Sequence, residues 1–156
     1  MQIETERKFL VKNDAYKAEA VETHRIRQGY IAHDSGRSVR VRLWDERAIL
    51  TVKGPFLSGA SRMEWEKEIT PGEAEELFFL CKPGGVDKIR YIIPAGNGRR
   101  FEVDEFFGEN QGLVLAEIEL GSEDEAFSRP SWLGEEVTGD PRYYNGYLAR
   151  KPFTTW

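Results

Sequence analysis

The chain has 156 residues, of which 40% are hydrophobic and 31% are charged, and this composition is typical of one globular domain spanning residues 1–156. A net charge of -5 argues against a protein that binds nucleic acid without regard to sequence, because such proteins carry a basic surface. A single cysteine excludes an intramolecular disulfide, and the chain has no apolar run of about 18 residues, so we expect a cytoplasmic protein that does not bind a membrane.

The main pattern along the chain is an alternation of apolar and polar residues, which predicts β-strands. It recurs in about eight segments, at residues 3–10, 25–31, 38–43, 47–53, 61–69, 87–93, 99–106 and 113–120. Glycine, proline, asparagine and aspartate favour turns, and we place turns at residues 34–36, at Gly54-Pro55 and at residues 96–98.

Helices are predicted to be few. Asn13 and Asp14 predict the cap of a short helix that runs to Ala20. A capping box with proline at the first helical position predicts a second helix, which begins at Thr70 and ends before Pro83. Residues 140–150 predict a C-terminal helix. The sequence therefore predicts a mainly β (α+β) fold, in which an antiparallel barrel removes the exposed edges of an open sheet and a few helices pack outside it.

Many of the predicted strands carry charge on one face only. In the first strand Glu4, Glu6 and Lys8 share a face, and apolar residues such as Ile3 and Phe9 lie on the other. Two interpretations fit this alternation. Either the apolar face fills the barrel and the charges lie in water, as in most small antiparallel sheets, or the charges lie inside and the apolar face is buried under the helices.

The sign of the charge differs from strand to strand. Arg40 and Arg42 lie on one strand, whereas Glu117 and Glu119 lie on another. Like charges two residues apart on a strand lie roughly 6–7 Å apart and repel each other unless a counter-ion lies between them. The pattern therefore indicates a polyanion on the basic strands, best met by a phosphate chain, and a hard cation such as Mg²⁺ or Mn²⁺, with Ca²⁺ also possible, on the carboxylates.

The charged segments also follow one another in a particular order. The first is Glu4-Thr5-Glu6-Arg7-Lys8, of the form E-x-E-x-K. The later ones are Arg40-Val41-Arg42, Thr51-Val52-Lys53-Gly54, Arg62-Met63-Glu64-Trp65-Glu66, Lys88-Ile89-Arg90-Tyr91, Glu102-Val103-Asp104-Glu105 and Glu117-Ile118-Glu119-Leu120. Over essentially the whole chain this order resembles the CYTH proteins, or triphosphate tunnel metalloenzymes, of the small bacterial single-domain type. The resemblance implies an eight-stranded closed β-barrel with the charged face inside.

The resemblance also implies roles for these residues. The metal ligands would be Glu4, Glu6, Asp104, Glu117 and Glu119, helped by Glu64, Glu66 or Glu102. The residues that bind phosphate would be Lys8, Arg40, Arg42, Lys53, Arg62, Lys88 and Arg90. Lys8 or Lys88 is also a candidate catalytic general base, because neighbouring cations lower the pKa of a lysine.

The function implied by the resemblance is metal-dependent hydrolysis of a linear triphosphate, with inorganic tripolyphosphate, cleaved to pyrophosphate and phosphate, as the first candidate. A nucleoside or thiamine triphosphatase and a class IV adenylate cyclase are alternatives on the same scaffold. A non-catalytic polyphosphate-binding module is a further alternative, although anion binding alone does not require clustered carboxylates. The expected partner is a small-molecule triphosphate. The resemblance also makes a homodimer possible, because members of the family are often dimers.

Overall fold

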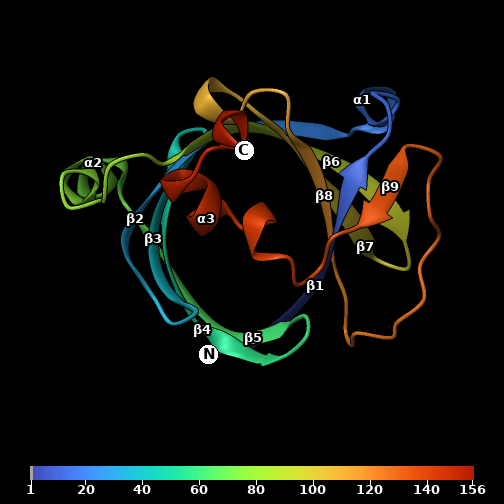
Figure 1. Cartoon of the computed structure of the whole chain (residues 1–156), viewed down its shortest axis with the longest axis horizontal. Coiled ribbons are helices and arrows are strands. Elements are labelled where there is room, and N and C mark those ends of the chain that lie inside the picture. The colour runs from blue at the N-terminus through green and yellow to red at the C-terminus, as the bar shows by residue number, and fades with distance from the viewer. Residues whose placement is uncertain (1) are drawn as a thin grey trace.

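The computed structural model describes residues 2–156, which form a closed antiparallel barrel. Eight strands build the barrel wall: β1 (Gln2–Val11), β2 (Glu22–Asp34), β3 (Arg37–Trp44), β4 (Arg47–Ser58), β5 (Ser61–Ile69), β6 (Val86–Gly96), β7 (Arg99–Phe106) and β8 (Val114–Glu119). Their order is β5-β4-β3-β2-β6-β7-β8-β1, and pairing of β5 with β1 closes the ring (Figure 1). The predicted eight-stranded barrel is confirmed.

A ninth strand, β9 (Leu133–Glu136), was not predicted. It pairs with the end of β1, where Val11 lies opposite Leu133. The first half of β1 pairs with β5, through residues such as Glu4 opposite Arg62. Because β1 leaves β5 after only a few residues, its last residues need another partner, and β9 supplies it.

The predicted turn at Gly54-Pro55 is wrong. Strand β4 continues through both residues to Ser58, and the hairpin reverses at residues 59–60 instead. The pairing of β4 with β5 shifts register between Lys53 and Phe56. A bulge leaves a residue unpaired, so the missing N–H of proline costs no ladder hydrogen bond there. The turns at residues 34–36 and 96–98 are confirmed, with positive φ at residues such as Gly36.

The helices are few, as predicted. They are α1 (Tyr16–Glu19), α2 (Pro71–Phe78) and α3 (Asn145–Arg150), with 3₁₀ turns η1 (Gly108–Asn110), η2 (Pro141–Tyr143) and η3 (Phe153–Thr155). Helix α2 ends at Phe78, earlier than the expected end before Pro83. The capping box of α2 is present, with Thr70 and Glu73 bonded to each other's backbone N–H. The predicted C-terminal helix is broken into η2 and α3, because Tyr144 between them is extended. Within residues 2–156 no helix has the length and apolar character needed to cross a membrane.

Apolar side chains cover the outside of most of the barrel. On one side Phe9, Phe101 and Ile118 pack beneath Tyr16 of α1 and Trp132. On the β3 and β4 side the apolar residues pack under α2. Figure 1 shows α1 and α2 outside the ring of strands and α3 in its opening. The interpretation with the charged face inside the barrel is therefore confirmed.

A third apolar cluster closes one end of the barrel from within. Leu115 and Phe106 point to the interior at that end and pack against Leu148 of α3, which is fully buried. The C-terminal segment thus forms the floor of the barrel, and the charged interior lies above it.

Candidate functional site

The barrel holds a charged cavity of about 440 Å³. Of the residues predicted from the sequence, those that line it are Glu4, Glu6, Lys8, Arg40, Arg42, Lys53, Arg62, Glu64, Arg90, Glu117 and Glu119. Lys88 and Asp104 are not in its lining. The cavity also contacts Glu66 and Glu102, which the sequence analysis placed as helpers of the metal ligands.

Strand register brings these side chains to one face. Lys8 on β1 lies opposite Glu117 on β8, and Lys53 on β4 lies opposite Glu64 on β5. Residues that face each other across an antiparallel pair point to the same side of the sheet. The alternation within each strand and the pairing between strands therefore bring these charged side chains together inside the barrel.

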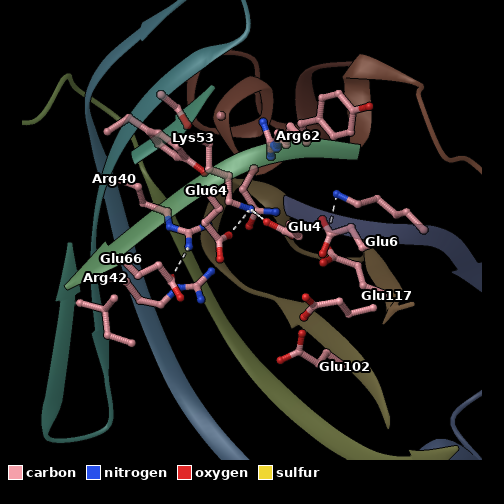
Figure 2. A pocket seen from close by; sticks show the side chains of 18 of the residues that line it. Glu4, Glu6, Arg40, Arg42, Lys53, Arg62, Glu64, Glu66, Glu102 and Glu117 are labelled. Carbon is pink, nitrogen blue, oxygen red and sulfur yellow. Dashed lines mark ion pairs between the residues drawn. The ribbon is translucent and has the colours of Figure 1, made fainter. Parts of the chain in front are cut away.

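One wall of the cavity is basic. Arg40 and Arg42 of β3 are both buried, and Figure 2 shows them on the side of the cavity away from Glu6, Glu102 and Glu117. Burial, together with the charges of Arg40 and Arg90, lowers the pKa of Arg42 to about 9. Nε of Arg40 is buried without a hydrogen-bond partner among the described residues. A wall that crowds cations and leaves a donor unpaired is suited to binding an anion.

The opposite wall is acidic. Glu6 lies opposite Glu119 across β1 and β8, and Glu102 lies opposite Glu117 across β7 and β8. Burial, followed by the nearby charges of Glu4 and Glu6, raises the pKa of Glu119 to about 7. Among residues 2–156, no three of these carboxylates converge closely enough to hold a metal ion as they stand. Their mutual repulsion and their all-oxygen donor set nevertheless fit a hard divalent cation.

Lysines lie between the two walls. Nζ of Lys53 is 2.8 Å from Oε2 of Glu4, in a geometry poor for a hydrogen bond, and 3.4 Å from Oε2 of Glu64 (Figure 2). Nζ of Lys8 is 3.2 Å from Oε1 of Glu117. Burial disfavours the charged form of Lys8, but Glu117 and Glu6 outweigh that effect and raise its pKa. Lys8 therefore stays protonated and suits a role in binding anions.

Lys88 and Asp104 also point into the barrel, where they are buried beneath residues that line the cavity. Nζ of Lys88 is 2.6 Å from Oδ2 of Asp104, and both side chains are almost completely buried. Arg90 donates from Nε and Nη2 to the two carboxylate oxygens of Asp104, at 2.7 and 2.8 Å. Burial lowers the pKa of Lys88 to about 7, although Asp104 opposes this shift. Both oxygens of Asp104 are thus occupied by cations of the protein.

The C-terminal segment forms the closed end of the site. The ring of Tyr144 stacks on Phe56, with centroids 5.4 Å apart, and lies 5.0 Å from Nζ of Lys8. Nζ of Lys8 also donates to the backbone oxygen of Tyr143 at 2.9 Å, and Nζ of Lys88 donates to Oδ1 of Asn145 at 2.8 Å. Both candidate general bases are therefore held by the segment that closes the barrel.

The sequence analysis missed the uncharged members of the site. Gln28, Asn145 and Tyr144 contact the basic residues, but none carries a charge that a pattern of charges would reveal. The alternation in β2 does place Gln28 on the same face as its neighbour Arg42 in β3. For Asn145 the sequence contains no such signal, because its position depends on how α3 enters the barrel.

Comparison with known proteins agrees with this geometry. The sequence model that defines the CYTH domain family matches residues 2–144 of this chain. A curated relative from Acetivibrio thermocellus, named inorganic triphosphatase, is 50% identical over 96% of this chain and 95% of its own. Another of the same name, from Nitrosomonas europaea, is 37% identical over 94% of this chain and 96% of its own. A crystal structure of an inorganic triphosphatase superposes with a TM-score of 0.65 at 36% identity, covering 96% of this chain and 95% of that one.

Proposed function

The chain belongs to the CYTH domain family, and on that basis we propose that it hydrolyses inorganic tripolyphosphate to pyrophosphate and phosphate. Two curated relatives that align over nearly its full length are named inorganic triphosphatases, which supports this substrate. The observation that carries the proposal is the cavity itself, in which a basic wall faces an acidic wall above a closed floor. One wall suits the phosphate chain and the other a divalent cation.

The phosphate chain would lie against the basic residues that line the cavity, which are Lys8, Arg40, Arg42, Lys53, Arg62 and Arg90. Arg42 and Arg62 form no ion pair with a carboxylate in the part of the chain that the structure describes, so their charge is available to a ligand. A guanidinium group can donate two parallel hydrogen bonds to the oxygens of one phosphate. It also stabilises the negative charge that develops when a phosphoryl group is transferred. Lys88 would support this wall from deeper in the barrel.

The cation would be Mg²⁺ or Mn²⁺, held by Glu4, Glu6, Glu117 and Glu119, with Glu64 beside them. When bound, it supplies positive charge that polarises a phosphoryl oxygen. Asp104 has the donor type for the same role, but its oxygens bind Arg90 and Lys88, so we assign it to positioning these two residues.

The two candidate general bases differ in their surroundings. The carboxylates around Lys8 keep it protonated, so we assign it to binding phosphate. Lys88 has the lowered pKa that a base requires, but it is fully buried and its Nζ already contacts Asn145 and Asp104. If Lys88→Met leaves the rate of the chemical step unchanged in single-turnover measurements, Lys88 is not the base.

The proposal is tested by offering the purified protein tripolyphosphate, ATP and thiamine triphosphate with Mg²⁺ or Mn²⁺ and identifying the products. Tripolyphosphate should be cleaved well above the other two. The double variant Glu4→Gln/Glu6→Gln should lose this activity, whereas Glu109→Gln, a matched change at an exposed position, should keep it. Cyclic AMP and pyrophosphate from ATP would instead identify a cyclase, and tight binding without turnover would identify a binding module.

A further inference from the structure

We propose that Gln28 and Asn145 form a neutral amide bridge that holds Arg42 in position to bind phosphate, so that the C-terminal helix contributes to the substrate site and does more than close it. The inference rests on the proposed function, because it assigns these two side chains to positioning for the same phosphate site.

The bridge is a continuous chain of hydrogen bonds along the inner face of three neighbouring strands, β3, β2 and β6. Nε of Arg42 donates to Oε1 of Gln28 at 2.9 Å. Nε2 of Gln28 donates to Oδ1 of Asn145 at 3.1 Å, and the same oxygen accepts from Nζ of Lys88 at 2.8 Å. Gln28 is 2% exposed, so solvent does not compete for these bonds. Three strands and α3 are thereby joined through two amide side chains.

Arg42 fixes the orientation of both amides. A guanidinium can only donate, so Gln28 must present its oxygen to Arg42. The NH₂ group of Gln28 is then the donor that remains for Asn145. Asn145 must therefore accept with its own oxygen from Gln28, and the same oxygen accepts from Nζ of Lys88. Each amide therefore has one orientation that satisfies its neighbours, which makes the bridge a rigid support.

The contrast with Arg90 indicates what a neutral support achieves. Arg90 is held by two carboxylates, since its Nε and Nη2 bind Asp104 and its Nη1 lies 3.1 Å from Glu102. A carboxylate orients an arginine but also compensates its charge. Gln28 orients Arg42 through Nε alone, which keeps the full charge and leaves the two terminal nitrogens to grip phosphate oxygens.

The test is a double-mutant cycle between Gln28→Met and Arg42→Met. We expect Gln28→Met to raise the KM for tripolyphosphate about tenfold, the effect of losing one hydrogen bond to a charged group, with little change in kcat. In the Arg42→Met background the same change should raise KM no further, because the residue acts through Arg42. Asn145→Leu should behave as Gln28→Met does. Gln111→Met, at an exposed position, is the matched control.

A second measurement separates this inference from the proposed function. The Kd for tripolyphosphate, measured by calorimetry in EDTA, does not depend on turnover. If the wild type binds tripolyphosphate but does not cleave it when Mg²⁺ or Mn²⁺ is present, the proposed function fails. The double-mutant cycle, with Kd in place of KM, still tests the inference. If Gln28→Met does not fold, the isosteric variant Gln28→Glu replaces it. Its carboxylate would compensate the charge of Arg42, so it should bind tripolyphosphate more weakly than the wild type and more weakly than expected for Gln28→Met. Additive effects in the cycle, an unchanged Kd in the Gln28 variant, or no binding by the wild type would each overturn the inference.

Discussion

Glu6 and Glu119 stand directly opposite each other on β1 and β8, and both side chains line the cavity. Like charges at facing positions on a sheet destabilise the strand pair, and Glu119 forms no ion pair with a lysine or arginine in the described part of the chain. A divalent cation between the two carboxylates would convert this repulsion into attraction. The pair therefore links the stability of the barrel to the metal proposed for the site.

The first prediction concerns this pair. Glu119→Gln removes one of the two opposed charges, so in EDTA the variant should be more stable than the wild type, by up to about 1 kcal/mol. Mg²⁺ should raise the unfolding temperature of the wild type, because it binds the folded state alone, but should raise that of Glu119→Gln much less. Thermal unfolding with EDTA and with MgCl₂ measures both effects. Glu109→Gln serves as control, and a full Mg²⁺ response in Glu119→Gln would exclude Glu119 as a ligand.

The second prediction concerns Asp104, which binds Arg90 and Lys88 beneath the cavity lining. Asp104→Asn leaves two buried cations short of a partner, so the free energy of unfolding should fall by about 3–5 kcal/mol. The stabilisation by Mg²⁺ should persist, because the side chain does not line the cavity. Denaturant unfolding with and without Mg²⁺ gives both quantities. A variant that kept its stability and lost its response to Mg²⁺ would instead make Asp104 a metal ligand.

The third prediction compares two glycines with positive φ. A Cβ on Gly84 would collide with the backbone oxygen of Ala149 in α3, whereas a Cβ on Gly98 would meet nothing within 4 Å. Gly98→Ala should cost only the backbone strain, about 1–2 kcal/mol. Gly84→Ala should cost more and should also raise the KM for tripolyphosphate, since displacing α3 moves Asn145. Equal losses of stability with unchanged KM in both variants would show that α3 can shift without consequence for the site.

The fourth prediction is a pH dependence. Arg7 binds Glu136 with two hydrogen bonds, at 2.8 and 2.6 Å, and holds the pKa of that carboxyl below its usual value. A lowered pKa in the folded state means that the pair stabilises the fold above the unfolded pKa, about 4.3, and that this contribution is lost as the pH falls through the folded pKa.

Glu136→Gln should therefore reduce the free energy of unfolding by about 1 kcal/mol at pH 7, a value discounted for the partial exposure of both side chains. At a pH of about 2 the variant and the wild type should be equally stable. Urea unfolding across this range measures the difference. Glu75→Gln, at an exposed pair 3.7 Å from Arg27, is the control. A difference that did not shrink with acid would mean that Glu136 acts through packing and not through its charge.

Much of the fold follows from local signals. The alternation in each strand identified all eight strands of the barrel, and the capping box at Thr70 located α2. The misplaced turn and the missed strand share a cause. Gly54-Pro55 is a turn signal in isolation, but the bulge in β4 lets the strand continue, and β9 is a strand only because β1 leaves an edge for it. Both outcomes depend on a neighbouring strand that no local pattern contains.

The sequence by itself determined which residues would be charged, on which face of each strand they would lie, and which sign each strand would carry. Side-chain direction in a strand follows from its two-residue period, so these features need no knowledge of the rest of the chain. Only the tertiary structure decided which charged residues reach the cavity. It buried Lys88 and Asp104 beneath the residues that line the cavity and brought Asn145 to Gln28, 117 residues away in the chain. Burial and contact at such separations are set by the closure of the barrel and the docking of α3, which depend on the whole chain at once.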